Sequence, residues 1–167
     1  MTEQNEQITI AMAKGRLAEQ TMELMEGMGI DVSPLREKSR KLVFESADGK
    51  YRYIMVKPSD VPTYVDHGVA DVGIVGKDTL MEENRPLYEM LDLGFGKCSI
   101  CVCGYAKQEP LKKAHIRVAT KYTGIAGQVF ATRGSSIEII KLNGSIELAP
   151  LLGLSDVIVD IVRSEEH

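Results

Sequence analysis

The 167-residue sequence lacks three features that would each assign it to a class of protein. It has no run of about 20 apolar residues, so we expect no membrane-spanning helix. Its first residues, MTEQNEQ, are polar and acidic, without the basic and then apolar segments of a secretory signal. Its net charge of -4 and pI near 5.5 argue against a nucleic-acid-binding surface. We therefore expect a cytoplasmic protein that binds neither membranes nor nucleic acid.

Cysteines are few, and their spacing does not favour a metal site. Cys98, Cys101 and Cys103 lie in KCSICVCGYA, which alternates like a strand. On a strand, Cys101 and Cys103 face one side and Cys98 the other, so they cannot converge on one ion. Zinc sites also need a second pair of Cys or His ligands, and the three histidines are scattered. We expect reduced, mostly buried structural thiols and no metal ligands, with a redox role as the alternative.

Sequence motifs of four common enzyme classes are also missing. The chain has no GxxxxGK[ST] loop and no GxGxxG run, so P-loop and Rossmann nucleotide sites lack support. It has no HExxH and no GxSxG, which removes support for a zinc protease or a hydrolase.

Length and glycine placement predict two α/β units. A chain of 167 residues suits one large or two small domains and can bury a real core. The stretch LDLGFGK contains two glycines and interrupts the pattern of strands and helices on either side of it. We interpret residues 93–97 as a hinge. The predicted domains are residues 1–92 and 98–167. In each, strands alternate with helices, which predicts a parallel-rich sheet.

The elements can be placed along both units. In the first, residues 8–12 form a strand, and a helix follows with apolar positions at helical spacing. These positions are Leu17, Thr21, Leu24, Met25 and Met28. Residues 41–45 and 51–56 predict a hairpin around the turn ADGK. After the cysteine strand, further strands are predicted at residues 116–119, 137–141 and 156–162, with helices through Phe130 and from about Glu147.

The segment SDVPTYVDHGVADVGIVGKD predicts a ligand-binding arrangement of helix, strand and helix. Ser59 can cap the first helix. The residues VGIV predict a strand buried on both faces, and Gly76, Lys77 and Asp78 open the next helix. Backbone N–H groups and a lysine therefore gather at the end of a strand, where anions bind.

Basic side chains at element boundaries are candidates for anion contacts. They are Lys14 and Arg16 after the first strand, Arg40 in KSRKL, and Lys77 after VGIV. Arg16 follows a glycine at a strand-to-helix turn, where a guanidinium and helix N–H groups together suit a phosphate. For Arg40, composition alone does not distinguish a functional residue from a solvated surface residue. We interpret Lys113 as a surface residue.

A second candidate contact is the tripeptide Asn143-Gly144-Ser145. Glycine allows close approach to a phosphate or ribose, and Ser145 can cap a helix, although most such tripeptides are simple caps. Glu147, Asp156 and Asp160 lie near strand or helix ends, where a carboxylate can accept hydrogen bonds from ribose hydroxyls. A solvent-facing first-turn position is the alternative for Glu147. Asp156 lies in the turn between a helix and the last strand, and a structural role in that turn accounts for an aspartate there without a function in binding.

Six blocks of the sequence, in order, resemble the catalytic subunit of ATP phosphoribosyltransferase. They are AMAKGRLAEQTMELMEGMGI, SRKLVFES, KPSDVPTYVDHGVADVGIVGKDTL, YEMLDLGFGKC, RVATKYTGIAGQVF and EIIKLNGSIELAPLLGLSDVIVDIV. Their order and spacing match across nearly the whole chain. The resemblance is to the short form, which lacks a downstream regulatory domain and pairs with a histidyl-tRNA-synthetase-like regulatory subunit in a hetero-oligomer.

This resemblance implies a fold and a reaction. The implied fold has two α/β domains of periplasmic-binding-protein-like (type II) architecture with a cleft between them. The implied reaction is a glycosyl transfer, the first step of histidine biosynthesis, in which N1 of ATP attacks C1 of phosphoribosyl pyrophosphate and pyrophosphate leaves. Such chemistry needs positive charge at the leaving group more than a nucleophilic side chain. Mg²⁺ is expected to be carried mainly by substrate phosphates and water.

The resemblance also implies roles for individual residues. Arg16 in the KGR motif and Arg40 in the SRKL motif match positions that the family uses for nucleotide and pyrophosphate contact, and we expect them to be catalytic. The matching blocks imply the following substrate-binding residues: Lys14, Gly15, Asp60, Gly76, Lys77, Asp78, Lys121, Asn143, Gly144, Ser145, Glu147 and Asp160.

Two features depart from the family pattern. Thr123-Gly124 stands where the family usually has a Pro-Asn-like pair, which predicts a looser turn. The family continues after DIV with a Thr-Gly-x-Thr-Leu loop for the sugar 5-phosphate and with elements that return to the first domain. Here RSEEH follows, so we expect the chain as it stands to lack both. We then expect it to bind phosphoribosyl pyrophosphate more poorly than ATP and not to catalyse the transfer at a useful rate. The alternative function is a small-ligand or nucleotide-binding module of the same fold without turnover.

Overall fold

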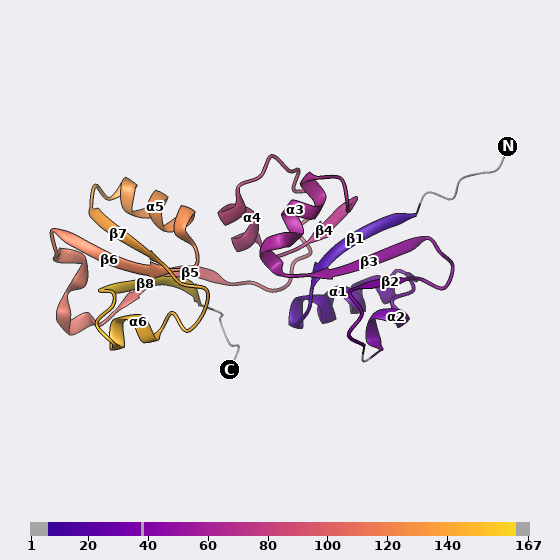
Figure 1. Ribbon diagram of the computed structural model, residues 1–167, viewed down its shortest axis with the longest axis horizontal. Helices are drawn as coiled ribbons and strands as arrows, with labels where there is room; N and C mark the ends of the chain where they lie inside the picture. The colour runs from indigo at the N-terminus through magenta and orange to yellow at the C-terminus, as the bar shows by residue number, and fades with distance from the viewer. Residues whose placement is uncertain (1–6, 38, 163–167) are drawn as a thin grey trace. The chain divides into compact units, whose positions relative to one another are not determined.

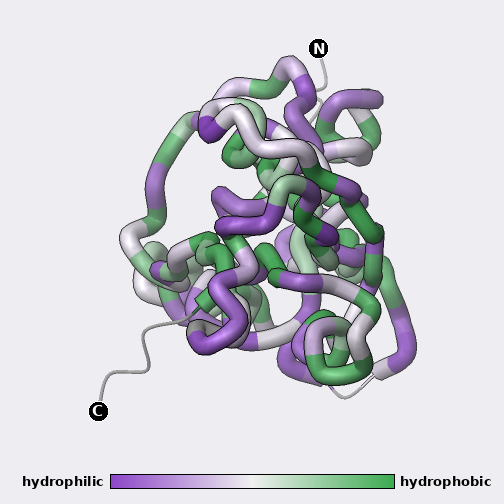
Figure 2. The backbone as a smooth tube through the Cα atoms, turned by 90° about the vertical axis from the view of Figure 1, so that its left-hand side faces the viewer, coloured by the Kyte–Doolittle hydropathy of each residue, from purple (hydrophilic) through white to green (hydrophobic). Residues whose placement is uncertain are grey.

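The chain folds into two compact units, Met1–Gly96 and Lys97–His167 (Figure 1). The computed structural model describes residues 7–37 and 39–162, so the segment after DIV, where the sequence predicts no phosphate loop, lies outside the described residues. Hydrophobic and hydrophilic stretches alternate along the backbone in Figure 2, as expected for elements that bury one side. No helix in the described part is long and apolar enough to cross a membrane.

The first unit contains a four-stranded sheet in the order β2-β3-β1-β4. Strands β1, β3 and β4 are parallel, and β2 pairs antiparallel with β3 as the predicted hairpin. A short 3-10 turn, Pro58–Asp60, precedes α3. The elements are β1 Ile8–Ala13, α1 Arg16–Gly27, α2 Ser33–Arg36, β2 Val43–Glu45, β3 Tyr51–Val56, α3 Val61–Asp66, β4 Val72–Ile74 and α4 Lys77–Glu83.

Helices cover both faces of this sheet because alternate residues of β1 point to opposite sides. Ile10 and Met12 pack in one cluster with residues of α1, while Ala11 packs in another with Val61 of α3. Tyr53 of β3 is fully buried in the first cluster and donates a hydrogen bond to the carbonyl of Asp31 over 2.7 Å. Two helices thus hold the central strand from both sides, with its carboxyl end at one edge.

The buried face of α1 differs from the predicted one. Thr21 and Met25 are buried as expected, but Leu24 is 39% and Met28 61% exposed. Ala18 and Met22 fill the interface instead. The helical period was correct, but the buried stripe is rotated, so that Ala18 and Met22 face the core in place of Leu24 and Met28.

The prediction that the VGIV strand is buried on both faces was wrong. Strand β4 lies at the edge of the sheet order, is three residues long, and leaves Val72 46% exposed. One face at Gly73 is covered, because a Cβ there would lie 2.8 Å from Val61 and 2.9 Å from Val65 of α3. Ser59 was also misplaced as a helix cap: Asp60 precedes α3, and the Ser59 hydroxyl donates to the Asp60 carboxylate.

The second unit contains a sheet in the order β5-β8-β6-β7. Strands β6, β7 and β8 are parallel, and β5 pairs antiparallel with β8. Two 3-10 turns, Ala106–Gln108 and Pro110–Lys112, connect β5 to β6. The elements are β5 Ser99–Gly104, β6 His115–Thr120, α5 Thr123–Thr132, β7 Ser136–Lys141, α6 Leu148–Leu151 and β8 Val157–Val162.

The two units share one connection pattern. In each, a first parallel strand is followed by a helix, a second strand, a helix and a third strand, and the first strand lies between the other two. The loops after the first and second of these strands leave toward opposite faces, since α1 and α3, and likewise α5 and α6, pack with residues of opposite faces. Ligands bind at the carboxyl ends of such strands.

Candidate active site

The first candidate site lies where the parallel strands of the first unit end. Ala13 of β1 is paired with Val56 of β3, and Met12 with Ile74 of β4. The segments that follow, residues 14–16, 57–60 and 76–78, therefore leave the sheet at the same edge. This brings together most of the residues of the first unit that the sequence singled out.

The turn from β1 into α1 exposes a helix start and two cations. Gly15 has a φ of 116°, a conformation that favours glycine, and it precedes α1 without a side-chain cap. Lys14 and Arg16 on either side of it are exposed. An anion here would meet two positive side chains and the amino terminus of a 12-residue helix.

Two grooves flank Lys14. The larger, of about 520 Å³, lies beside the end of β3, and the smaller, of about 280 Å³, lies toward α1 and α2. Lys14 and Met55 contribute to both grooves. The larger is lined by Lys14, Leu42, Met55, Val56, Lys57, Pro58, Asp60 and Tyr64. Asp60 and Lys14 thus line the same groove, and their role in substrate binding stays a prediction.

Sequence reasoning missed Lys57 and Tyr64. Lys57 directly follows β3 just as Lys14 follows β1, so the rule that selected Lys14 applies to it as well. Tyr64 lines the same groove from α3 and is 37% exposed. The groove therefore offers two cations, one carboxylate and one aromatic ring.

Arg40 lies in the loop before β2. It is exposed and follows Ser39, which lines the smaller groove and accepts a hydrogen bond from the N–H of Lys41 over 3.1 Å. Neither groove has Arg40 in its lining. Its catalytic role stays a prediction.

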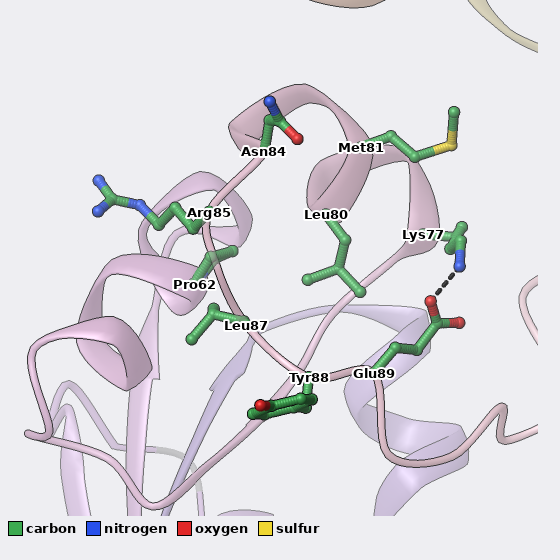
Figure 3. A pocket seen from close by; sticks show the side chains of 9 residues that line it. All are labelled: Pro62, Lys77, Leu80, Met81, Asn84, Arg85, Leu87, Tyr88 and Glu89. Atoms are coloured by element: carbon green, nitrogen blue, oxygen red, sulfur yellow. Dashed lines mark hydrogen bonds and ion pairs between the residues drawn. The ribbon is translucent and has the colours of Figure 1, made fainter.

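The Lys77 ammonium is paired with the carboxylate of Glu89. Lys77 begins α4 and forms an ion pair with Glu89 across a pocket of about 190 Å³ (Figure 3). Both side chains are about half exposed, so an incoming anion can compete for the ammonium. A Cβ on Gly76 would approach the Asp78 carboxylate closely, so a larger residue at this helix start would require the flexible Asp78 side chain to move.

The second candidate site lies at the corresponding edge of the second unit. Lys121 follows β6, Asn143 and Gly144 follow β7, and Asp160 lies near the end of β8. The Lys121 ammonium lies 4.6 Å from the centre of the Tyr122 ring. Asp160 is half-buried, and its carboxylate accepts a hydrogen bond from the N–H of Ile161 over 2.8 Å.

The loop after β7 corrects the predicted cap at Ser145. Ser145 has a φ of 50°, in the left-handed region, and its carbonyl accepts a hydrogen bond from the N–H of Leu148 over 3.2 Å. Glu147 precedes α6 and is exposed, and no side chain caps this four-residue helix. The residues Asn143, Gly144, Ser145 and Glu147 are therefore exposed in a turn rather than a capped helix start, while Ile146 between them is buried.

The cysteines are only partly as expected. Cys101 and Cys103 are half-buried on one face of β5, but Cys98 precedes the strand and is exposed, so its predicted burial was wrong. Burial raises the pKa of the Cys103 thiol, and Cys101 and Asp160 add to this rise. Within residues 7–37 and 39–162, no group of three or more His, Cys, Asp or Glu side chains could hold a metal ion.

Asp156 lies at the opposite edge of the sheet, before β8. Its carboxylate accepts hydrogen bonds from Lys113 (2.6 Å) and from the main chain and guanidinium of Arg117 (2.8 to 3.3 Å). Hydrogen bonds from Arg117 and Lys113 hold the pKa of Asp156 well below its usual range. The network supports the structural interpretation of Asp156 and shows that Lys113 is more than a solvated surface lysine.

Comparisons with known proteins identify the family of this chain. The sequence profile of the ATP phosphoribosyltransferase family matches residues 57–167. ATP phosphoribosyltransferases of Alkaliphilus metalliredigens and Lachnospira eligens are 54% and 53% identical, over 94% of this chain and 75% and 74% of their own length.

A solved structure shows the same fold. It is an ATP phosphoribosyl transferase (HisG:HisZ) complex from Thermotoga maritima, with a TM-score of 0.80 and 34% identity. The match covers 94% of this chain and 75% of that one. This chain belongs to the ATP phosphoribosyltransferase family.

Proposed function

We propose that the two sheet edges divide the substrates of ATP phosphoribosyltransferase between them. The first unit, through Lys14, Arg16 and the groove beside β3, contacts ATP and the departing pyrophosphate. The second unit, through Lys121, Asn143 and Asp160, contacts the phosphoribosyl group. The observation that supports this proposal is the shared topology, which places candidate residues at the carboxyl ends of parallel strands in both units.

The chemistry fits residues of this kind. N1 of ATP forms a bond to C1 of the sugar, while the bond from C1 to the pyrophosphate oxygen breaks and its electron pair leaves with pyrophosphate. Positive charge on the sugar and negative charge on the leaving group develop together. Fixed cations near the leaving group stabilise that state, which is the role we propose for Arg16, Arg40 and Lys14. No side chain needs to form a covalent intermediate.

The remaining proposed contacts complete these two sets. In the first unit, Gly15, Asp60, Gly76, Lys77 and Asp78 lie at the same edge as Arg16. In the second unit, Gly144, Ser145 and Glu147 follow β7 in the exposed turn. Their polar groups can bind ribose hydroxyls and phosphate oxygens.

Mg²⁺ belongs to the substrates in this proposal. The described residues offer no cluster of acidic or histidine side chains that would form a cage for the ion. Mg²⁺ commonly keeps several waters and binds substrate phosphates. The ion would neutralise phosphate charge, and we assign it no protein ligand.

We further propose that the chain works in a hetero-oligomer. The Thermotoga maritima relative was solved as a HisG:HisZ complex. The short-form resemblance implies a histidyl-tRNA-synthetase-like regulatory subunit as the partner. A binding module without turnover is not favoured, because the matching relatives are transferases. A cytoplasmic location stays a prediction.

Kinetics of Arg16→Ala, measured on a full-length version of the protein with its regulatory partner, test the proposed function. Loss of one donor aimed at the leaving group typically lowers the rate by about 100-fold or more, so turnover should fall while the melting temperature stays unchanged. Arg52→Ala is the matched control, because Arg52 is an exposed arginine of β3 paired with Glu45. Unchanged turnover in Arg16→Ala would refute the assignment.

A further inference from the structure

Thr120 connects the ends of three strands in the second unit. It is the last residue of β6 and is fully buried. Its hydroxyl donates to the main-chain carbonyl of Val159 in β8 over 2.6 Å and accepts from the N–H of Tyr122 over 2.8 Å. Its own carbonyl accepts from the N–H of Leu142, just past β7, over 3.0 Å.

Each of these three partners is the immediate neighbour of a candidate substrate residue. Lys121 lies between Thr120 and Tyr122, Asn143 follows Leu142, and Asp160 follows Val159. The pairing of β6 with β8 ends at Thr120 and Val159, so the hydroxyl fastens the two strands where their main-chain ladder stops. The positions of Lys121 and Asp160 therefore depend on one buried hydroxyl.

The link to Lys121 continues through the Tyr122 ring. The Tyr122 side chain is buried, with the residue 3% exposed, and the Lys121 ammonium lies over its ring at 4.6 Å. The Thr120 hydroxyl fixes the Tyr122 main chain, and the ring in turn supports the lysine. A shift of the Tyr122 main chain would therefore move the cation.

We propose that Thr120 is a positioning residue of the phosphoribosyl pyrophosphate subsite. It touches no substrate, and it acts by holding Lys121 and Asp160 at a fixed separation across β6 and β8. The inference rests on the proposed function, in which these two residues contact that substrate. It adds a residue that neither charge nor exposure would select.

Thr120→Val removes the hydroxyl and nearly keeps the shape. Val159 and Tyr122 each lose a buried partner, whereas the main-chain bond to Leu142 remains. A misplacement of about 1 Å can lower a rate by about 100-fold, so we expect the KM for phosphoribosyl pyrophosphate to rise about tenfold or more. The KM for ATP should stay unchanged, and Thr120→Ser should restore both values because it keeps the hydroxyl.

The experiment measures both KM values, kcat and the melting temperature on a full-length version of the protein, in the complex with the regulatory subunit. Amide exchange at Tyr122 gives a second readout, and protection should fall in Thr120→Val and return in Thr120→Ser. Thr132→Val is the matched control, because that hydroxyl donates to the Val129 carbonyl over 2.7 Å at the exposed end of α5. If Thr120→Val does not fold, Thr120→Cys, with its weak donor, takes its place.

The outcomes separate this inference from the proposed function. If Lys121→Ala raises the KM for phosphoribosyl pyrophosphate while Thr120→Val does not, the positioning role is overturned and the subsite stands. An equal rise of both KM values together with a lower melting temperature also overturns it, because the residue would then be merely structural. If Lys121→Ala has no effect, the proposed subsite itself fails.

Discussion

Replacement of Asp156 with alanine should destabilise the second unit strongly. Asp156 is 8% exposed, and its carboxylate accepts four hydrogen bonds, one from Lys113 and three from Arg117. Breaking a buried ion pair by removing one partner costs about 3 to 5 kcal/mol of unfolding free energy. The Lys113 and Arg117 side chains are 46% and 40% exposed and regain water, which places the expected loss near the lower limit, at about 3 kcal/mol.

The same network predicts a pH dependence with a definite sign. Hydrogen bonds from Arg117 and Lys113 lower the pKa of Asp156 in the folded protein, whereas an unfolded Asp titrates near about 3.9. A lowered folded pKa contributes stability that is fully present above the unfolded pKa and is lost as the pH falls toward the folded one. The stability difference between wild type and Asp156→Asn should therefore be constant from about pH 7 to 5 and shrink below about pH 4.

Urea titrations followed by circular dichroism at several pH values would measure this difference. Glu138→Gln is the control, because Glu138 is a carboxylate of the same unit with a mostly exposed side chain. A difference that disappears already between pH 7 and 5 would refute the reasoning. A difference that persists unchanged below about pH 4 would show that the Asp156 carboxylate does not stabilise the fold through its negative charge.

Three further outcomes are expected. Thiol titration of the denatured protein should count three free groups, and stoichiometric zinc by elemental analysis would contradict the assignment of Cys98, Cys101 and Cys103 as plain thiols. Gly73→Ala should lower the unfolding free energy by about 1 to 3 kcal/mol in denaturant titrations, because the added Cβ would press on α3, and an unchanged midpoint would disprove that contact. Light scattering and activity assays on a full-length version of the protein, with and without the synthetase-like subunit, should show a larger, more active complex, and full activity without that subunit would argue against the proposed partner.

Much of the fold followed from local patterns. The hairpin of β2 and β3 was placed from an alternating pattern on each side of a glycine turn, and its register pairs Val43 with Ile54. Helix α4 begins at Lys77, within the segment that the sequence predicted to open a helix. Such elements depend on neighbouring residues, so the sequence contains their signals directly.

Burial was harder to predict because it depends on which strands become neighbours. VGIV has the composition of a central strand, yet β4 lies at the edge, and nothing within those residues specifies the strand order. Met28 continues the apolar period of α1 but lies beyond its end, 61% exposed. Periodicity identifies a face, and tertiary packing decides how much of that face is covered.

The candidate site was predicted in part for a similar reason. Residues with charge at element boundaries, such as Arg16, can be recognised in the sequence alone. Lys57 could have been selected by the same rule as Lys14, but only the parallel pairing of β3 with β1 shows that the two lysines line one groove. Thr120 has no charge and no exposure, and only its hydrogen bonds distinguish it.

The pairing of β5 with β8 has a consequence for how the chain folds during synthesis. Ser99 pairs with Val162, so the first strand of the second unit finds its partner only after nearly all of that unit has been made. Contacts between residues so distant in sequence slow folding, because the intervening chain must be ordered first. Until then, the N–H and C=O groups of β5 remain available to other strands, which makes this strand a natural point for chaperone binding or for misassembly at high concentration.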